Sequence, residues 1–260
     1  MGKYGLIGYK LGHSFSMGIH EAYYDKIGEQ STYSLVEISE SELEPFLKSI
    51  GEKGFSGVNV TIPYKKPVMP YLDEIAPEAL KIGAVNTIKV SDGKLYGFNT
   101  DYYGFEKTLD KYNIDILGKN VYILGTGGAS KAVSAVCCDR GADVTFVSRT
   151  PSDNVISYDA LENRKGGIIV NCTPVGMYPN VDDAPMDTVE NFEAVVDLIY
   201  NPSKTKLMKK AESFGIKAVN GLYMLVAQAI YSESIWHDMD FELDMVDEIF
   251  DKLFGENDVK

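Results

Sequence analysis

Short apolar runs alternate along the chain with segments whose apolar residues recur every three or four positions. Runs of β-branched and aromatic residues predict strands, and the longer period predicts helices. Helical patterns begin after Ser16 and cover residues 41–50 and about 102–112, and Asp92-Gly93 is the turn signal of a β-hairpin. The strands expected in this first part are residues 3–8, 31–38, 57–60, 84–90 and 94–100. The pattern predicts an α/β lobe.

A second lobe is expected to begin after Gly118. Residues 120–125 form a continuous apolar strand, residues 126–142 a glycine turn with a helix, and residues 143–150 a second strand. This order is a βαβ unit, the start of a doubly wound parallel sheet. Further strands are predicted at residues 166–172, 193–200 and 215–219, and helices at residues 204–214, 222–237 and 241–254. We therefore predict an α/β protein with two lobes.

Composition narrows the function classes. Of 260 residues 45% are hydrophobic and 24% charged, which is ordinary globular usage, and no apolar run approaches a membrane span. The first residues lack a secretory-signal pattern, so a cytoplasmic protein is expected. A net charge of -13 argues against nucleic-acid or anionic-membrane partners and leaves a small-molecule substrate.

The cysteines and histidines suggest no metal site. Cys137, Cys138 and Cys172 fit neither a disulfide framework nor a zinc motif, and we interpret them as reduced, buried thiols. The three histidines, His13, His20 and His237, are too scattered to form a ligand set.

A glycine-rich turn follows the first strand of the second lobe. Its residues are Gly125, Thr126, Gly127, Gly128, Ala129 and Ser130. Backbone amides of such a turn approach a pyrophosphate closely, and the helix N-terminus favours its charge. A tight structural turn is the alternative.

The end of the next strand indicates which dinucleotide is bound. NAD enzymes place an acidic residue there, whereas this chain has Ser148, Arg149 and Thr150. A carboxylate repels a 2′-phosphate, whereas an arginine and hydroxyl donors bind one. NADP is therefore predicted over NAD, the alternative being a solvated arginine after a strand.

Three polar clusters lie in the first lobe. Ser14 and Ser16 precede a helix, where two hydroxyls and the helix amides suit a carboxylate, although an N-cap serine is the alternative. Asn59 and Thr61 share one face of a predicted strand, with Lys65 just beyond its end. The opposite, buried face is expected to carry Val58, Val60 and Ile62.

The third cluster brackets the hairpin. Asn86 precedes it and Asp101 follows it, so both return to the same edge of the sheet. Asp101 has an alternative role as the cap of the next helix.

These motifs resemble the shikimate dehydrogenase family, whose NADP-dependent members reduce 3-dehydroshikimate to shikimate in aromatic (chorismate) biosynthesis. The likeness covers nearly the whole chain: the serine pair, the run Asn59 to Lys65, Gly83 to Thr87, Asn99 to Asp101, Asn171 to Met177 and Gly221 to Gln228. Two positions depart from the pattern: Thr126 replaces an alanine, a change expected to be harmless, and Ser148 replaces an asparagine. Because Ser148 is a shorter donor and no second arginine follows, NADP is expected to bind more weakly than is typical of the family.

The resemblance implies roles for individual residues. Lys65 and Asp101 become the catalytic pair of an oxidoreductase acting on a CH–OH group. The substrate would be held by Ser14, Ser16, Asn59, Thr61, Asn86, Tyr200 and Gln228. The cofactor would be held by Gly125, Thr126, Gly127, Gly128, Ala129, Ser148, Arg149 and Thr150, and on the nicotinamide side by Thr173, Gly176, Met177, Gly221 and Met224.

The resemblance also implies an architecture: a substrate-binding domain of residues 1–100 and 237–260, a Rossmann NADP-binding domain of residues 101–236, and a cleft where they meet. Either a monomer or a homodimer is compatible with the sequence. Three other functions stay open: a quinate/shikimate dehydrogenase using NAD, a non-catalytic ligand sensor, and a methylenetetrahydrofolate dehydrogenase-like enzyme.

Overall fold

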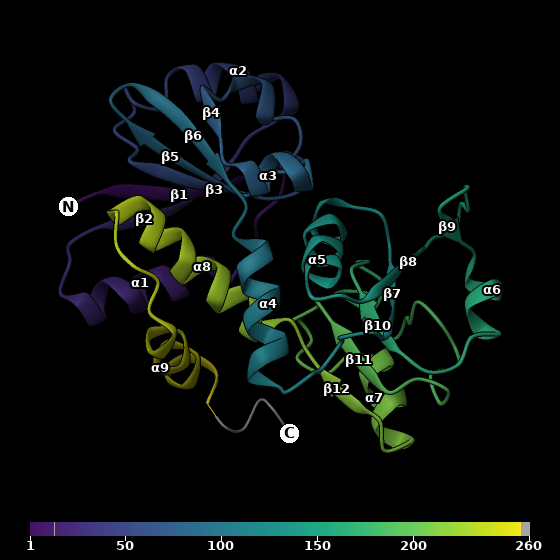
Figure 1. Ribbon diagram of the computed structural model, residues 1–260. Coiled ribbons are helices and arrows are strands. Elements are labelled where there is room, and N and C mark those ends of the chain that lie inside the picture. The colour runs from purple at the N-terminus through teal and green to yellow at the C-terminus, as the bar shows by residue number, and fades with distance from the viewer. Residues whose placement is uncertain (13, 256–260) are drawn as a thin grey trace. The chain divides into compact units, whose positions relative to one another are not determined.

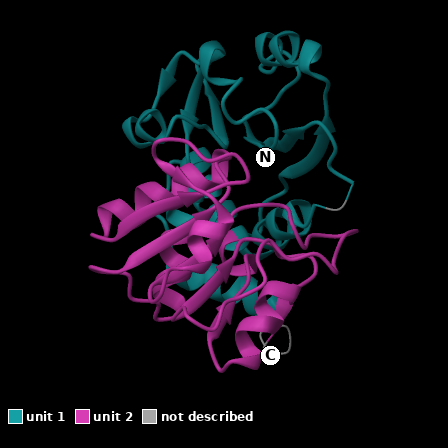
Figure 2. Ribbon diagram, turned by 90° about the vertical axis from the view of Figure 1, so that its right-hand side faces the viewer, with its two compact units in different colours: residues 1–104, 225–253 teal, residues 105–224, 254–260 magenta. Residues whose placement is uncertain are grey.

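The computed structural model describes residues 1–12 and 14–255, which divide into two compact units (Figure 2). Unit 1 comprises Met1–Gly104 and Leu225–Leu253, and unit 2 comprises Phe105–Met224 and the chain end from Phe254. Each unit contains its own six-stranded sheet, so the predicted α/β class with two lobes is confirmed.

The sheet of unit 1 has the order β2-β1-β3-β5-β6-β4. Strands β1, β2 and β3 run parallel, whereas β5 lies antiparallel to both β3 and β6. The strand bounds are β1 (Lys3–Gly8), β2 (Thr32–Glu37), β3 (Gly57–Val60), β4 (Glu74–Ile75), β5 (Thr87–Ser91) and β6 (Lys94–Phe98). The helices that lie wholly or mostly in this unit are α1 (Ser16–Ile27), α2 (Glu40–Lys48), the 3₁₀ helix η1 (Met69–Tyr71), α3 (Pro77–Ile82), α8 (Leu222–His237) and α9 (Leu243–Phe254). Helix α4 (Asp101–Lys111) begins in unit 1 and continues in unit 2.

The two faces of this sheet carry different chemistry. Because side chains alternate along a strand, Val58 and Val60 of β3 join the apolar core with Leu43 and Leu47 of α2. Asn59, between the two valines, faces Ser232 of α8 instead. In Figure 1 α2 lies on one side of the sheet, and α1, α8 and α9 lie on the other. The α8 side of the sheet is therefore where polar groups are buried.

Local sequence signals explain several boundaries. Asp92 and Gly93 both have positive φ, 52° and 73°, as a two-residue hairpin turn requires, which confirms the predicted hairpin. Strand β3 ends at Val60, and Ile62 is 77% exposed, so the prediction that Ile62 lies on the buried face is wrong. The chain has already turned there, because Tyr64 N–H donates to the Thr61 carbonyl.

Unit 2 has an all-parallel sheet of order β12-β11-β10-β7-β8-β9. The strands are β7 (Asn120–Leu124), β8 (Asp143–Val147), β9 (Val155–Ile156), β10 (Ile168–Asn171), β11 (Ala194–Asp197) and β12 (Lys217–Val219). Its helices are α5 (Gly128–Asp139), α6 (Tyr158–Glu162) and α7 (Lys206–Ser213). The strand order reverses at β7 and β10, and the carboxyl ends of strands at such a switch point form the ligand crevice of open α/β sheets.

The boundary of unit 1 differs from the predicted one. Residues 225–236 were expected in the cofactor domain, with the return at 237, whereas they pack in unit 1. The reason is α8 itself: the Trp236 indole donates to the Ile88 carbonyl at 3.0 Å and stacks on Tyr4. A side chain at Gly57 would collide with that indole, so glycine allows this close packing.

The cysteine prediction needs a correction. Not all three thiols are buried: Cys137 is buried, whereas Cys138 is exposed and Cys172 half-buried. Cys137 and Cys138 differ in burial because consecutive helical residues point about 100° apart, so only Cys137 belongs to the buried face of α5. Within residues 1–12 and 14–255, no helix combines the length and apolar character needed to cross a bilayer.

Candidate active site

Lys65 and Asp101 form an ion pair in unit 1. The Lys65 Nζ donates to Asp101 Oδ2 at 2.6 Å, and the side chains are only 16% and 8% exposed. Asn86 Nδ2 donates to the other oxygen, Asp101 Oδ1, at 2.9 Å. Each carboxylate oxygen thus has a fixed donor, and an ammonium group is held at a defined place with little water around it.

Backbone pairing brings these residues together. Val85 N–H donates to the Lys65 carbonyl at 2.7 Å, and Asn86 N–H donates to the Phe98 carbonyl at 3.0 Å. Asp101 begins α4 three positions after Phe98, the last residue of β6. Side chains from the turn after β3, the start of β5 and the start of α4 therefore meet at one edge of the sheet.

Asn86 is held from several sides. Its Oδ1 accepts from the Thr100 backbone N–H at 2.7 Å, and its Nδ2 donates to both Asp101 and the Thr100 hydroxyl. A backbone N–H can only donate, so the orientation of the Asn86 amide is unambiguous. The amide thus orients the Asp101 carboxylate.

Asn59 and Thr61 lie at the end of β3. Asn59 is 5% exposed, and its Oδ1 accepts from the Tyr33 hydroxyl at 2.9 Å. Thr61 is half-buried, and its N–H donates to the Ile7 carbonyl at 3.0 Å. Complete burial and neighbouring acidic charge at Glu233 hold the pKa of Tyr33 well above its usual value, so its hydroxyl stays a donor.

The serine pair lies at the start of α1. The N-cap residue is Phe15, which makes no side-chain cap bond, and Ser14 Oγ accepts from the Ser16 N–H at 3.2 Å. Ser14 thus accepts from one N–H at the start of α1, as the alternative of an N-cap serine would, although it is not itself the N-cap residue. Ser16, the first helical residue, is 8% exposed and lies near enough to the Tyr33 hydroxyl to oppose the rise of its pKa caused by burial.

Gln228 reaches the same group of side chains from α8. Its Nε2 donates to the Leu225 carbonyl at 2.7 Å, and its Oε1 accepts weakly from the Thr100 hydroxyl at 3.5 Å. One hydrogen of Nε2 and most of the capacity of Oε1 are not used by these two bonds. Hydrogen bonds therefore connect the predicted side chains of unit 1 except Thr61 and the serine pair. Ser16 of that pair lies near Tyr33, which donates to Asn59.

Some residues of this hydrogen-bond network were not predicted from the sequence. Tyr33, Thr87, Thr100 and Ser232 all bond directly to the predicted residues. A signal for Ser232 exists in its spacing, because residues four apart lie on the same face of a helix and Gln228 is four residues earlier. Tyr33 lies in an ordinary strand pattern and carries no such signal.

In unit 2 the glycine turn fits a pyrophosphate. Gly125 has φ 99°, and an added Cβ would lie 3.0 Å from Thr173 Cγ2. Both the backbone conformation and the lack of space therefore disfavour a side chain at this position. Gly127 is the N-cap of α5, and an added Cβ would meet nothing within 4 Å, so its backbone faces open space. Thr126 and Gly127 are exposed, and Gly128 and Ala129 are half-buried at the start of the helix.

Arg149 follows β8 as predicted. Arg149 and Thr150 are exposed and Ser148 is half-buried, with its hydroxyl accepting from the Thr150 N–H at 3.3 Å. Among the described residues, none forms an ion pair with Arg149. Burial raises the pKa of Tyr158, and the nearby Arg149 guanidinium opposes part of that rise. A cation without a carboxylate partner suits a phosphate group.

A loop after β10 is anchored by buried polar groups. Asn171 Oδ1 accepts from both the N–H and the hydroxyl of Thr173, and Asn171 Nδ2 donates to Asp197 at 2.9 Å. Burial raises the pKa of Asp197 to about 6 against the hydrogen bonds from Thr205, the Ile199 N–H and Asn171. Within the loop Gly176 has φ 98° and is buried, whereas Met177 is 45% exposed.

The remaining predicted residues lie around the start of α8. At Gly221 a side chain would collide with the Leu198 carbonyl, so glycine is required there, and Met224 is buried. Tyr200 is half-buried, and burial raises the pKa of its hydroxyl. No group of His, Cys, Asp and Glu able to hold a metal occurs among residues 1–12 and 14–255.

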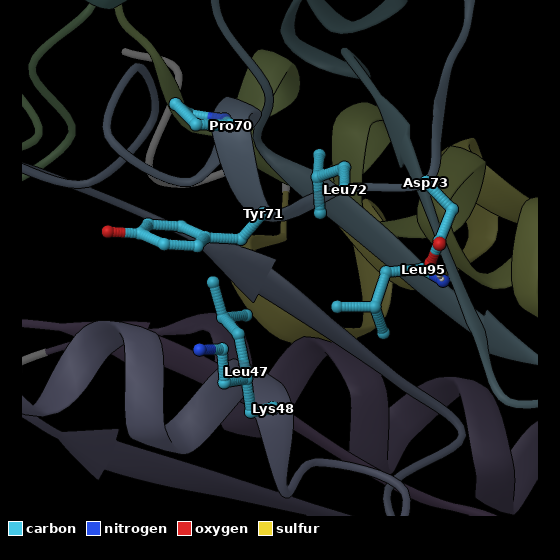
Figure 3. Close-up of a pocket in the computed structure, with 7 residues that line it drawn as sticks. All are labelled: Leu47, Lys48, Pro70, Tyr71, Leu72, Asp73 and Leu95. Atoms are coloured by element: carbon cyan, nitrogen blue, oxygen red, sulfur yellow. Dashed lines mark hydrogen bonds between the residues drawn. The ribbon is translucent and has the colours of Figure 1, made fainter.

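A separate pocket of about 300 Å³ lies in unit 1 (Figure 3). Its polar groups already have partners: Lys48 pairs with Glu44, and Asp73 accepts from the Leu95 N–H. It shares no residue with the site above and offers no catalytic group. Its lining is Leu47, Lys48, Pro70, Tyr71, Leu72, Asp73 and Leu95.

Comparison with known proteins gives the same family in sequence and in structure. The family model for the shikimate dehydrogenase substrate binding domain matches residues 6–88. A shikimate dehydrogenase (NADP(+)) of Clostridium beijerinckii is 44% identical over 247 residues, 90% of this chain and 92% of that one.

Two solved structures superpose on this chain over almost their whole length. The chorismate mutase/shikimate 5-dehydrogenase fusion protein of Clostridium acetobutylicum superposes with a TM-score of 0.93 at 46% identity, covering 97% of each chain. The shikimate 5-dehydrogenase of Thermus thermophilus, in complex with NADP(H) and shikimate, has a TM-score of 0.86 at 30% identity, covering 97% of this chain and 99% of that one. With this likeness in both sequence and fold, the chain belongs to the shikimate dehydrogenase family.

Proposed function

We propose that this protein is an NADP-dependent shikimate dehydrogenase in which Lys65 and Asp101 form the catalytic pair. The observation that carries the proposal is the poorly hydrated contact of 2.6 Å from Lys65 Nζ to Asp101 Oδ2, with Asn86 holding the second carboxylate oxygen. Such an arrangement supplies a positioned acid whose geometry is set before substrate arrives.

The chemistry at this pair is a proton transfer coupled to a hydride transfer. When bound, the reduced nicotinamide supplies the hydride to C3 of 3-dehydroshikimate. Lys65 Nζ donates a proton to the C3 oxygen as negative charge develops there, so the ketone becomes a hydroxyl. Asp101 stabilises the charged lysine and orients it toward that oxygen. In the reverse direction Lys65 accepts the proton as hydride leaves.

Further residues are proposed to hold the substrate. Ser14 and Ser16, with the first amides of α1, suit its carboxylate, because hydroxyls and helix amides donate to an anion. Tyr200 is proposed for the same group by family resemblance alone. The ring hydroxyls are assigned to Asn59, Thr61, Asn86, Asp101 and Gln228.

The cofactor is proposed to lie at the carboxyl ends of β7 and β10. The open backbone at Gly127 and the N-terminus of α5 suit the pyrophosphate. Arg149, with Ser148 and Thr150, suits the 2′-phosphate. The loop with Thr173, Gly176 and Met177, together with Gly221 and Met224, is assigned to the nicotinamide side. A cytoplasmic location stays a prediction, and a monomer or homodimer stays open.

The test is dehydrogenase activity with four substrate pairs. Purified protein is mixed with shikimate or quinate and with NADP or NAD, and reduction is followed by absorbance at about 340 nm. Turnover chiefly with shikimate and NADP is expected. Preference for quinate and NAD would identify the quinate/shikimate variant, and no turnover in any combination would refute an enzyme and favour a ligand sensor.

The catalytic pair is tested separately. Lys65→Ala should lower kcat far more than it raises the KM for shikimate, because the lysine acts on the charge that develops in the transition state. Lys66→Ala is the matched control, since Lys66 is the next residue and is exposed. If kcat is unchanged in Lys65→Ala, Lys65 is not the proton donor.

A further inference from the structure

Three buried hydroxyls meet beneath the candidate active site. Thr87 Oγ1 lies 2.9 Å from Ser232 Oγ and 3.2 Å from Thr100 Oγ1, and Thr100 Oγ1 lies 3.2 Å from Ser232 Oγ. All three residues are fully buried. We call them the hydroxyl triangle. It joins β5, the residue before α4 and helix α8, so it ties the helix to the sheet.

The hydroxyl triangle and the Asn86 carbonyl together hold the nitrogen end of the Asn59 amide. Asn59 Nδ2 donates to Ser232 Oγ at 2.9 Å, to Thr87 Oγ1 at 3.1 Å and to the Asn86 carbonyl at 3.3 Å. A carbonyl can only accept, so this side of the amide must be the nitrogen. Three acceptors compete for the two hydrogens of Nδ2, and no donor capacity is left for a ligand.

The other end of the amide keeps one free acceptor. Asn59 Oδ1 accepts from the Tyr33 hydroxyl at 2.9 Å. A carboxamide oxygen has two lone pairs, so a single acceptor position remains. Asn59 can therefore only accept a hydrogen bond from a ligand, which means that the ligand must offer a donor, such as a hydroxyl, at this point.

Ser232 is the member that couples this selection to α8. Its hydroxyl donates to the Gln228 carbonyl at 2.9 Å, while its oxygen receives the Asn59 amide. Thr100, a second member, reaches the side chain of Gln228. A change at Ser232 therefore alters both a strand amide and a helix amide that are proposed to hold ring hydroxyls.

We propose that Ser232 is a positioning residue that, through the hydroxyl triangle, presents the Asn59 oxygen as an acceptor for one ring hydroxyl of the substrate. This proposal rests on the proposed function, because it specifies how the same site selects its substrate. Tyr33 is a second positioning residue in this proposal, because its hydroxyl donates to the Oδ1 end of the Asn59 amide.

The test compares two serines of the same helix. Ser232→Ala and Ser234→Ala each remove a hydroxyl that donates to a helix carbonyl at 2.9 Å, Gln228 or Tyr231, and both serines are buried. Of these two serines, only Ser232 also accepts a hydrogen bond from Asn59 Nδ2. We expect Ser232→Ala to raise the KM and the calorimetric Kd for shikimate roughly tenfold, the scale of one buried hydrogen bond, with kcat lowered much less. Ser234→Ala should leave both near the unmodified values.

A structural defect would not distinguish between substrate hydroxyls, so shikimate analogues that each lack one ring hydroxyl supply the decisive readout. One such deletion should cost the unmodified enzyme roughly tenfold in Kd and cost Ser232→Ala far less, because the variant has already lost that contact. Tyr33→Phe, which leaves the hydroxyl triangle intact, should lose sensitivity to the same hydroxyl.

The outcomes separate the two proposals. Normal turnover with Ser232→Ala indistinguishable from Ser234→Ala would overturn the positioning role alone. So would an equal loss of affinity for every analogue, which indicates a general packing defect. No turnover of shikimate by the unmodified protein would refute the proposed function, and the positioning role with it.

Discussion

Glu233 is a buried carboxylate held by two histidines, next to Ser232 on α8. His20 Nδ1 contacts one of its oxygens, and His237 Nε2 lies 3.1 Å from the other. Burial alone would raise the pKa of Glu233, but the charge and hydrogen bond of His20, with His237, lower it below its ordinary value. The hydrogen bond to Glu233 raises the pKa of His237 against the effect of its burial.

The two shifts predict where this pair stabilises the fold. Folding lowers the pKa of Glu233, so its charge stabilises the protein above about pH 4.5, and this is lost as the pH falls through the lowered pKa. Folding raises the pKa of His237, so its charge stabilises the protein below about pH 6.5, and this is lost as the pH rises through the raised pKa. Both contributions are complete between these two values.

Glu233→Gln should therefore destabilise the protein most in that interval. The expected loss is about 3 kcal/mol, because the variant leaves buried imidazoles without their charged partner. Urea unfolding of the variant and the unmodified protein between pH 4 and pH 9 gives the difference. Glu248→Gln, which removes an exposed partner of Lys26, is the control and should change little at any pH. A difference independent of pH would rule out this linkage.

Arg149 gives a prediction about cofactor choice. Arg149→Ala should weaken NADP binding by about 1 to 3 kcal/mol, the cost of losing a charged donor to the 2′-phosphate. NAD binding should change little, because NAD has no such phosphate. Titration calorimetry with both dinucleotides measures the two losses. Arg164→Ala is a control that keeps the same change in net charge, and equal losses for NADP and NAD would refute the phosphate role.

Individual site residues differ in how far the sequence reveals them. Lys65 and Asp101 follow strand patterns, so alternation and the edge rule predicted a strand-end position for each, whereas their pairing was expected only from the family resemblance. Ser232 was not predicted, because its partner Asn59 lies 173 positions earlier and only the tertiary packing of α8 brings the two together. Ile62 was wrongly placed in the core because alternation was extended past the last residue of β3.

At the scale of elements, long periodic segments were predicted well and short ones were not. The strand at residues 3–8, the hairpin and α8 have clear patterns, and they are present as β1, β5–β6 and α8. The two-residue strands β4 and β9 and the five-residue helix α6 were missed. A pattern of period two or 3.6 needs several repeats to be recognised, and these elements are too short to contain them.

Helix α7 provides a test of how a cap and a buried carboxylate act together. The Thr205 hydroxyl accepts from the Met208 N–H and donates to Asp197 Oδ2 at 2.7 Å, whereas Ser157, the cap of α6, makes only the helix bond. Thr205→Ala should cost about 2 to 3 kcal/mol in urea unfolding, because it also leaves a buried carboxylate one donor short. Ser157→Ala should cost about 1 kcal/mol or less.

The conservative variant distinguishes hydrogen bonding from packing. Thr205→Ser keeps the hydroxyl and should recover most of the stability lost in Thr205→Ala. If Thr205→Ser is as unstable as Thr205→Ala, the methyl group and not the hydroxyl stabilises α7. Equal losses at Thr205 and Ser157 would mean that Asp197 adds nothing to the cap.

At the scale of the whole molecule, the sequence correctly indicates two α/β lobes, but it does not locate the point where the chain returns. An apolar helix such as α8 matches either lobe by pattern, since its mean composition suits burial on every side. Its side chains decide the question: Ser232 and Trp236 bond to unit 1. The start of α8 remains in unit 2, with Met224 as the last residue of that unit before the return.

This division predicts that the two ligands protect different parts of the chain. Hydrogen exchange read by mass spectrometry should show that NADP slows exchange in residues 120–150, where the glycine turn and Arg149 lie, because ligand binding suppresses local opening around its site. Shikimate alone should slow exchange in residues 57–65, 84–101 and 225–237. Arg149→Ala should need more NADP for the same protection and leave the shikimate pattern unchanged. Protection of residues 57–65 by NADP alone, with none in residues 120–150, would mean that the sheet of unit 2 does not bind the dinucleotide, because binding at the ends of β7 and β10 must restrain the backbone there first.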